Sequence, residues 1–503
     1  DIYGTHVSFD HEIISPGSGV PIVIEGGNQN AKTIEYAGNN DAFIAWADFR
    51  DGANADIYCQ RLDLSMSNLF LENGLQVSNS FEQDLNPRAT FVNNDVSFIC
   101  WKQGDESSKI FYNFVDEQGL VFSDPNPISS YDAIQTAPRV KRSYDGSVFV
   151  NWKDLRNDPI NGDQYFQKVG TGGDLFWADG VMLDPVQGID FSARFSSDMD
   201  GGLSVVWERG IFPEVDILYQ KINSDGSYAL ESPLEVSESP GYQFAPIISG
   251  NTSEGLYIIY ADKGSGSIDL LIQKLNQSYV PEWTGNGMMA MSGLDGDVNY
   301  SKSFRIMDED FFLIWEDNRS SKKIFGTRIT NLENQFVGGQ QLTYGDNSSS
   351  ETDFSLPVSA RNSQNIYLGT FDGSSAPKFI RINKLDDQLN NLWDPEGVAL
   401  SPVFDMRKAQ LFAIGQGVGC FWSESRGFNY DIFFQRLNEN GEATLDLNGK
   451  EIVDSNGDDY IMGVIPAEDN KFMIFGIRRN NFLGGLQCTV KIFTFGTFGN
   501  HTQ

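Results

Sequence analysis

An apolar run that ends at a tryptophan, a short polar loop and a second strand-like segment recur along this chain. In residues 42–62 the apolar run ends at Trp46, the loop carries Asp48 and Arg50, and the second segment begins at Asp56. The same order returns in residues 148–167 and 311–328. Recurrence at this period is typical of repeat architectures, whose units bury their apolar faces against one another.

The repeats align on the tryptophan position. The aligned residues, at intervals of 51–55 residues, are Trp46, Trp101, Trp152, Trp207, Tyr260, Trp315, Thr370, Trp422 and Phe475. This regular spacing leaves no room for an inserted second domain, so residues 1–503 are predicted to form one domain.

Four short strands are predicted in each repeat. Residues 137–141 are typical of the first strand, and an Asp-Gly pair supplies the tight turn that follows. The second strand, such as residues 203–207, is apolar throughout, which indicates burial on both faces. The third strand, such as residues 216–221, alternates, and a turn leads from it to a short fourth strand.

Units of four antiparallel strands are typical of propeller blades. The predicted fold is therefore all-β, a single large β-propeller of four-stranded blades, because stacking around an axis buries both faces of each blade. Separate β-sandwiches would need more strands in each unit and linkers between the units. Nine blades are favoured, and eight blades with a divergent terminal sheet are the alternative, since the repeat at Phe475 is the least typical.

The N-terminal strands, within residues 1–25, are predicted to close the ring. Residues 2–7 match the third strand of a repeat, and residues 19–23 match the fourth. Residues 487–493 match a third strand and have no clear fourth strand after them. The fourth-strand match at residues 19–23 is therefore expected to complete the last blade.

Charge and length limit the classes of partner. The 503 residues include 36 basic and 69 acidic side chains, for a formal net charge of −33. Such an excess repels phosphate backbones and anionic lipid surfaces, so nucleic-acid binding is not expected. No apolar run approaches the length of a membrane span, so direct membrane insertion is not expected either.

Cysteine and histidine usage gives no sign of a metal or redox centre. The four cysteines form no CxxC pair and fall within predicted strands, so buried free thiols are expected: Cys59, Cys100, Cys420 and Cys488. The three histidines lie near the termini, which argues against a histidine-based active site: His6, His11 and His501.

The full repeat, W-x-D-x-R, then D-I-Y-x-Q-[RK], then G-V-x-[VL], resembles a repeat of bacterial extracellular β-propellers. Such propellers are often found among the cargo of the type IX secretion system. The resemblance covers nearly the whole chain and implies a secreted or cell-surface protein. A protein or a glycan is the expected partner, because the repeat is regular and shows no recognisable catalytic constellation. The resemblance also implies a C-terminal sorting domain, and none is visible after the last blade, so the secretion route is left open.

An acid and an arginine recur in the loops of four repeats: Asp48 and Arg50, Asp154 and Arg156, Asp317 and Arg319, and Glu424 and Arg426. One interpretation is a ring of charged groups that binds a ligand, and the other is a pair that fastens the loop backbone. Repetition in several blades favours the structural interpretation. The residues assigned to this structural motif are Trp46, Asp48, Arg50, Trp101, Trp152, Asp154, Arg156, Trp207, Trp315, Asp317, Arg319 and Trp422.

Departures from the motif mark the expected partner contacts. Residues 209–213 and 478–482 replace the recurring loop in single blades. The candidate partner-binding residues there are Arg209, Phe212, Arg478, Arg479 and Phe482.

No catalytic residues are predicted. The Asp-box of sialidases is absent, and no nucleophile elbow, phosphate-binding loop or dinucleotide fingerprint is present. The favoured function is a non-catalytic binding module, or a subunit of a cell-surface or secretion-associated assembly. The alternative is a polysaccharide-active hydrolase or lyase, with acidic residues at the propeller funnel.

No cofactor is predicted. Residues 294–299 and 454–459 place oxygen ligands close together, as calcium requires, although surface turns explain both segments more simply.

Overall fold

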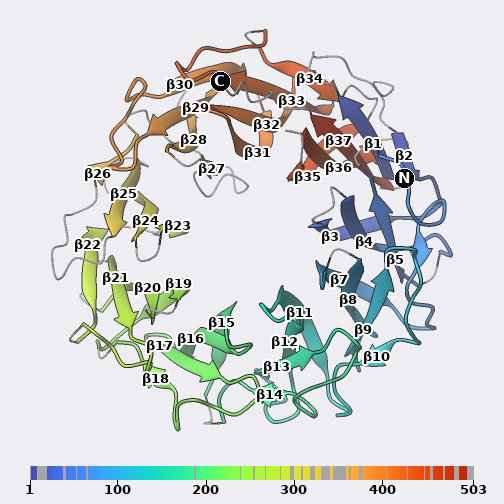
Figure 1. Cartoon of the computed structure of the whole chain (residues 1–503), viewed down its shortest axis with the longest axis vertical. Helices are drawn as coiled ribbons and strands as arrows, with labels where there is room; N and C mark the ends of the chain where they lie inside the picture. Colours follow the sequence, from blue (N-terminus) through green and yellow to red (C-terminus); the bar gives the residue numbers. More distant parts are fainter. Residues whose placement is uncertain are drawn as a thin grey trace. The chain divides into compact units, whose positions relative to one another are not determined.

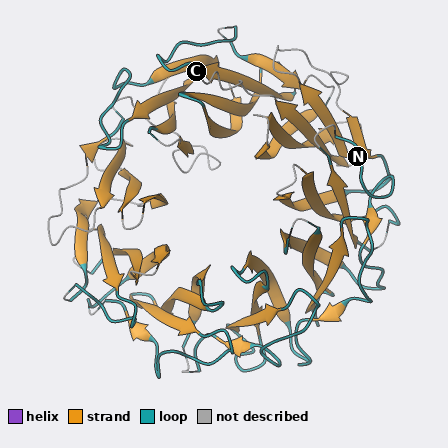
Figure 2. Cartoon of the chain, in the orientation of Figure 1, coloured by secondary structure: helices purple, strands orange, loops and turns teal. Residues whose placement is uncertain are grey.

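The computed structural model describes the chain except for several short segments. These are residues 1, 8–19, 38–40, 53, 64–65, 94, 186–187, 238, 253–254, 265, 267, 284, 295–299, 308–309, 318–322, 330–339, 344–357, 362–363, 373–377, 404, 428, 447, 454–456, 468–470, 481–486 and 496–503. Every regular element in the described part is a β-strand (Figure 2). The same part contains no helix that would cross a membrane.

The strands form antiparallel sheets that follow the sequence repeats (Figure 1). The described residues make eight four-stranded sheets and one five-stranded sheet, and in each four-stranded sheet neighbouring strands are consecutive in sequence. This series of four-stranded antiparallel sheets is the all-β fold of a β-propeller. That the sheets form a ring of nine blades stays a prediction.

The chain divides into two compact units, residues 1–127 with 347–503 and residues 128–346. That residues 1–503 form one domain also stays a prediction. In the second unit the sheets are β11 (Gln135–Arg142) to β12 (Val148–Asp154), β13 (Asp163–Val169) and β14 (Val181–Met182); β15 (Asp190–Ser197), β16 (Leu203–Ile211), β17 (Glu214–Ile222) and β18 (Leu234–Glu235); β19 (Gln243–Thr252), β20 (Gly255–Asp262), β21 (Ile268–Leu275) and β22 (Met288–Leu294); and β23 (Tyr300–Met307), β24 (Asp310–Asp317), β25 (Lys323–Ile329) and β26 (Gln340–Gln341).

The first unit holds the other five sheets. They are β27 (Val358–Arg361), β28 (Ile366–Asp372), β29 (Lys378–Leu385) and β30 (Val398–Val403); β31 (Asp405–Ile414), β32 (Gly417–Ser425), β33 (Tyr430–Leu437) and β34 (Lys450–Val453); β35 (Asp458–Ala467), β36 (Lys471–Asn480) and β37 (Gln487–Phe495) with β1 (Ile2–Val7) and β2 (Val20–Val23); β3 (Gln29–Ala37), β4 (Asp41–Asp48), β5 (Asp56–Leu62) and β6 (Leu75–Gln76); and β7 (Asp84–Phe91), β8 (Val96–Gln103), β9 (Lys109–Asp116) and β10 (Asn126–Pro127).

The core lies in layers between consecutive sheets. In the first unit β7 packs against β3, β4 and β5 of the sheet before it, and in the second unit β19 packs against β15, β16 and β17. One layer joins Phe43 to Trp101, and another joins Phe149 to Trp207. Six repeat tryptophans are fully buried: Trp46, Trp101, Trp152, Trp207, Trp315 and Trp422. Nearly every residue of the second strands β4, β20 and β32 is buried, as expected for a strand that is covered on both faces.

The N-terminal strands join the sheet of β35, β36 and β37 (Figure 1). Strand β1 lies parallel to β37, with Ile2 opposite Val490, and β2 pairs antiparallel with β1. The strand beside β37 is thus residues 2–7, whereas the sequence pattern favoured residues 19–23 for that place. No hairpin turn links the two ends of the chain, so no turn geometry requires an antiparallel strand there.

A β-bulge recurs in the first strand of several sheets. It falls between Leu85 and Arg88 in β7 and between Thr136 and Arg139 in β11, with equivalent shifts in β15 and β19. Each bulge contains a residue with a positive φ angle: Asn86, Ala137, Ser192 and Ala245. A bulge redirects the side chains beside it, and here it follows the residue that faces the loop after the tryptophan.

Candidate functional site

In two repeats that keep the motif, the acid and the arginine are hydrogen-bonded within the protein. Asp48 Oδ2 accepts hydrogen bonds from Trp46 Nε1 at 2.8 Å and from Arg50 Nη2 at 2.6 Å. Arg50 also donates to the carbonyl oxygen of Asn73 at 2.8 Å, and its guanidinium lies 3.9 Å from the ring centroid of Tyr58. Charge-assisted bonds of this kind fasten a loop to the strands on both sides of it.

Asp154 is held in the same way. It accepts from Trp152 Nε1 at 2.8 Å and from Arg156 Nη2 at 2.6 Å. Burial raises the pKa of Asp154, but the hydrogen bonds from Arg156 and Trp152 outweigh burial and keep this pKa below its ordinary value. A third repeat uses the longer acid Glu424, which accepts from Trp422 and Arg426. The side chain of Asp317 and the whole of Arg319 lie outside the part that the structure describes.

The repeat of Trp207 inverts this arrangement. Arg209 stands where the repeats of Trp46, Trp152 and Trp422 have the acid, and Asp190 on β15 lies directly opposite it. Asp190 Oδ1 accepts from Trp207 Nε1 at 2.9 Å and from Arg209 Nε at 3.1 Å. Arg209 also forms an ion pair with Asp184, whose side chain is buried. The tryptophan still meets a carboxylate, but that carboxylate comes from the neighbouring strand.

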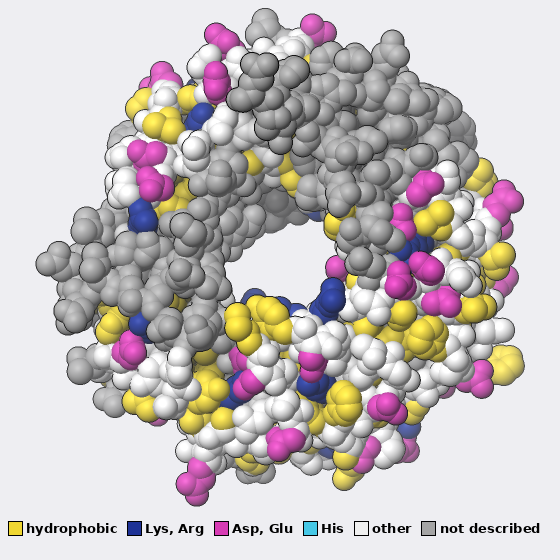
Figure 3. Space-filling view, viewed as in Figure 1, with side chains coloured by type: hydrophobic (Ala, Val, Ile, Leu, Met, Phe, Trp, Pro, Cys, Tyr) yellow, Lys and Arg dark blue, Asp and Glu magenta, His cyan; other side chains and the backbone are white. Residues whose placement is uncertain are grey.

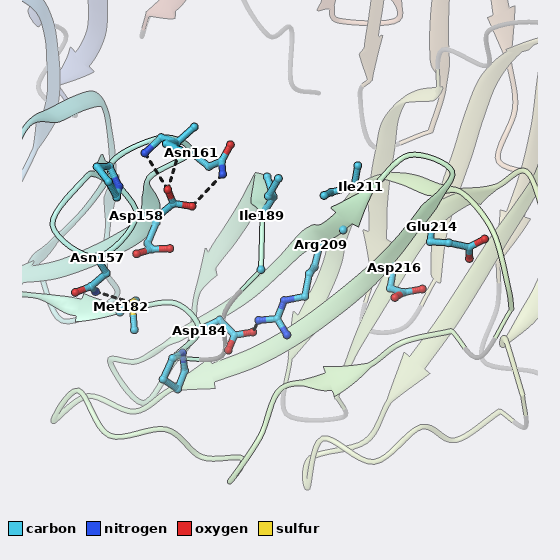
Figure 4. A pocket seen from close by; sticks show the side chains of 16 residues that line it. Asn157, Asp158, Asn161, Met182, Asp184, Ile189, Arg209, Ile211, Glu214 and Asp216 are labelled. Carbon is cyan, nitrogen blue, oxygen red and sulfur yellow. Dashed lines mark hydrogen bonds and ion pairs between the residues drawn. The ribbon is translucent and has the colours of Figure 1, made fainter.

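A cavity of about 1070 Å³ opens beside this inverted repeat. Its walls come from the loop between β12 and β13, the loop after β14, and the β16–β17 hairpin (Figure 4). Its polar lining is dominated by carboxylates: Asp158, Asp163, Asp184, Glu214 and Asp216. Arg209 is the one cation among the described residues that line it. A large concave site with convergent polar groups is the usual form of a ligand site.

Several polar groups of the lining are already engaged within the protein. Asp158 accepts from the backbone N–H groups of Ile160 and Asn161, each at 2.9 Å, and from the Asn161 side chain at 3.0 Å (Figure 4). The hydrogen bonds from Asn161 lower the pKa of Asp158. The side-chain amide of Asn157 donates to the hydroxyl of Tyr165 at 2.7 Å. These bonds hold the loop between β12 and β13 in shape.

Asp163 and Asp216 are the motif acids of the third strands in consecutive repeats: Asp163 is the first residue of β13, and Asp216 lies near the start of β17. Burial raises the pKa of Asp163, and the neighbouring carboxylate of Asp158 adds to this. Burial also raises the pKa of Asp216, with a further rise from Glu214 that Arg209 partly opposes. Both pKa values are raised because neither carboxylate has enough positive charge nearby to offset burial.

Exposed apolar side chains edge the cavity. Ile160 is 84% exposed and Ile211 is 70% exposed, and both belong to the lining. Phe212, at the tip of the β16–β17 hairpin, is 73% exposed. Its ring packs edge-on against Tyr242, with centroids 5.5 Å apart, and Tyr242 stacks on Phe244 at 4.8 Å. Large apolar side chains exposed beside a polar hollow are typical of interaction sites.

The predicted partner residues fall into three groups. Arg209 lines the cavity in two ion pairs, and Phe212 is exposed beside it. Arg478 is only 8% exposed, because it makes a bidentate pair with Asp459 at 2.9 and 3.1 Å. Its guanidinium therefore serves the sheet in this structure instead of facing a partner. The side chain of Arg479 and the whole of Phe482 lie outside the described residues.

The sequence analysis assigned no role to the glutamine of the third strand. Gln167 Nε2 donates to the carbonyl oxygen of Ala178, and its Oε1 accepts from the backbone N–H of Trp177. The next residue, Lys168, pairs with Asp145 at 2.7 Å. Equivalent amide bonds come from Gln60, Gln220, Gln273 and Gln435. The recurrence of Gln-Lys or Gln-Arg in the repeat was the available signal for this support.

Thiol and metal sites add little to the picture. Cys59, Cys100 and Cys420 are free and buried, and burial raises the pKa of each. Within the described ranges, no three His, Cys, Asp and Glu side chains are grouped to hold a metal ion. Residues 295–299 of the first predicted calcium turn and residues 454–456 of the second lie outside those ranges.

Comparison with known proteins identifies no family. No family model matches the chain, and no curated protein matches it. Among solved structures, a polysaccharide lyase of family PL25, an ulvan lyase, aligns at 10% identity with a TM-score of 0.42, covering 86% of this chain and 97% of the lyase. A eukaryotic initiation factor aligns at 10% identity with a TM-score of 0.46, covering 86% and 91%. An endo-arabinase from Bacteroides thetaiotaomicron aligns at 11% identity and 0.28, covering 52% and 96%. Likeness at this identity concerns the fold alone.

Proposed function

We propose that this protein is an exported, non-catalytic binding module that holds its ligand at the cavity between the β11–β14 and β15–β18 sheets. In this proposal the module belongs to a cell-surface or secretion-associated assembly. The main support is the repeat of Trp207, in which the acid lies on the first strand and an arginine lies on the second. There the acid and arginine no longer follow the ordinary pattern, and a large cavity with exposed apolar edges opens beside them. A site is usually an asymmetric departure from a repeat, since a repeated feature serves every blade alike.

The distribution of surface side chains supports binding. Figure 3 shows acidic and hydrophobic side chains interspersed over the described part of one face. Ile160 and Ile211 are exposed in the lining of the cavity, and Phe212 is exposed next to Ile211 at the tip of the β16–β17 hairpin. Apolar anchors surrounded by polar groups are what a protein interface requires, because desolvated anchors supply most of its binding energy.

Export is supported by the repeat's resemblance to extracellular propellers. The formal net charge of −33 is also compatible with a solvated protein that avoids nucleic acid. Protease treatment of intact producing cells tests this part of the proposal. Cleavage of the protein without lysis, or its recovery from the medium, agrees with export, and full protection until lysis contradicts it.

Site-specific photo-crosslinking tests the binding role. A benzophenone side chain is placed at position 211 in the full chain, and the matched control places it at position 280, where Val280 is also exposed in the same unit. We expect one adduct that forms from position 211 and not from position 280. Equal labelling from both positions, or no adduct from either, would contradict a ligand site at this cavity.

The alternative function is a polysaccharide-active hydrolase or lyase. The observation that favours it is the pair of carboxyls with raised pKa, Asp163 and Asp216, which line one cavity from neighbouring sheets. A raised pKa is what a general acid needs near neutral pH. Incubation with a panel of polysaccharides tests this alternative. Turnover that Asp163→Asn or Asp216→Asn abolishes would overturn the binding function.

A further inference from the structure

We infer that the ligand of this cavity is a polypeptide segment that places a lysine or arginine side chain beside an aliphatic or aromatic one. The inference rests on the proposed binding function and names the chemistry of the ligand. It is carried by three features of the same surface: the hydrogen-bonding character of the lining, its charge, and its exposed apolar edge.

Among the described residues of the lining, acceptor side chains outnumber donor side chains. An ionised carboxylate accepts hydrogen bonds and donates none, whereas an ammonium or guanidinium donates and accepts none. The side-chain donors of the lining are Asn157, Asn161 and Arg209, and each is bonded within the protein. Asp163 already accepts from the side chain of Asn157, and Glu214 accepts from the backbone N–H of Gly241. A ligand must bring its own donors to the remaining acceptor positions of these two carboxylates and to Asp216.

Charge complementarity gives the same answer. Five carboxylates line the cavity, and the guanidinium of Arg209 is shared between Asp184 and Asp190. Glu214 accepts the backbone N–H of Gly241 at 3.1 Å. A ligand cation beside Asp163 and Asp216 would reduce the repulsion among these carboxylates, whereas a ligand anion would be repelled by them.

The apolar edge distinguishes a polypeptide from a small cation. Ile160 and Ile211 both line the cavity and are exposed, so apolar groups of a ligand would gain contact area against them. A volume of about 1070 Å³ is larger than one side chain needs. Lysine and arginine carry apolar stems below their charged ends, so such a residue next to an apolar one matches both parts of the surface.

A neutral glycan matches this lining less well. Sugar hydroxyls both donate and accept, and a site for them pairs acceptors with available donors. The donors of this lining are engaged, as the preceding contacts show. We therefore expect a peptide in preference to a neutral glycan, and the experiment tests both.

Fluorescence anisotropy on the full chain uses three labelled twelve-residue peptides. One alternates lysine with leucine, one alternates lysine with glycine, and one alternates glutamate with leucine. We expect the lysine–leucine peptide to bind most tightly, the lysine–glycine peptide more weakly, and the glutamate–leucine peptide not at all. Binding should weaken with added salt, since salt screens the charges.

Two variants separate the cavity from the general negative charge of the protein. Asp163→Asn with Asp216→Asn should weaken binding of the lysine–leucine peptide roughly 10-fold, since two charge pairs are lost. The charge-matched control is Asp174→Asn with Glu231→Gln, which removes two exposed carboxylates of the same unit outside the cavity. Ile211→Ser should weaken binding roughly 5-fold through the lost apolar contact, and Val280→Ser is its control.

The outcomes distinguish this inference from the proposed function. Peptide binding that the cavity variants leave unchanged, or that the control variants weaken equally, overturns the inference. Binding of neutral oligosaccharides that Ile211→Ser weakens, without turnover, also overturns it while leaving the binding function in place. Turnover of a polysaccharide that depends on Asp163 or Asp216 overturns both.

Discussion

Asp190 lies directly across the strand pair from Arg209, in the place where Gln135 lies across from Asp154 one sheet earlier. In the ordinary repeat, Gln135 donates to Asp154 at 3.1 Å, and the acid belongs to the second strand. In the next repeat the acid has moved to the first strand and a guanidinium has taken its place. The tryptophan keeps a carboxylate partner in both repeats. Two residues after it, however, one repeat has the anionic Asp154 and the other has the cationic Arg209.

This exchange predicts that Arg209 and its acids depend on one another. Arg209→Met should lower the free energy of unfolding by about 3–5 kcal/mol, because it leaves the buried carboxylates of Asp184 and Asp190 without a cation. Adding Asp184→Ser and Asp190→Gln to this variant should recover most of the loss. Urea denaturation of the three proteins measures both effects. Equal stabilities for the single and triple variants would show that the ion pairs are not coupled.

The buried tryptophan layer predicts a large effect at a position far from the cavity. Trp315→Ala should lower the free energy of unfolding by about 3–5 kcal/mol, because Trp315 is fully buried against Leu313 and Ile272 in one core cluster. Phe176→Ala, at a half-exposed ring, is the control and should cost much less. Denaturant titration gives both values, and similar costs would contradict the assigned layer.

Asp154 predicts a pH-dependent contribution to stability. Its hydrogen bonds to Arg156 and Trp152 lower its pKa in the folded state, so its contribution is present above the unfolded pKa and is lost as pH falls through the folded pKa. Asp154→Asn should therefore lower the melting temperature at neutral pH, with a smaller difference near pH 2. Peptide binding at the cavity should remain intact. A binding loss without a change in melting temperature would instead assign Asp154 to the ligand.

Glu35 on β3 predicts the opposite dependence. Burial raises the pKa of Glu35 to about 7, so the folded state favours the protonated carboxyl. Stability from this group is complete below its unfolded pKa and is lost as pH rises toward 7. Glu35→Gln should raise the free energy of unfolding at pH 8 by about 1–3 kcal/mol and leave it unchanged at pH 4. A stabilisation that is equal at both pH values would rule out this titration.

The pairing of β1 with β37 predicts the effect of an N-terminal deletion. Removing residues 1–25 would expose the edge of β37, whose backbone groups pair with β1 along residues 2–7. An exposed edge strand recruits other chains, so we expect aggregation or a large loss of stability in size-exclusion chromatography and thermal melts. A monomeric protein with unchanged melting temperature would show that this pairing contributes little.

The sequence by itself determined the repeat and its strands. The tryptophan spacing and the apolar second strand set the four-stranded sheets, because burial on two faces can be satisfied only by neighbours on both sides. The sequence also marked the loop of Arg209 and Phe212 as a departure. A local pattern of apolar and turn residues is enough to specify a sheet whose paired strands are consecutive in sequence.

Only the tertiary structure decided what the departures mean. Arg209 and Arg478 each begin a segment that departs from the motif, yet Arg209 lines a cavity and Arg478 is buried against Asp459. The partners Asp184, Asp190 and Asp459 lie 19 to 25 residues away, since 209−184 is 25 and both 209−190 and 478−459 are 19. The parallel place of β1 beside β37 is likewise a contact between opposite ends of the chain. These contacts depend on which strands pack together in the folded protein, and a local sequence pattern does not specify that packing.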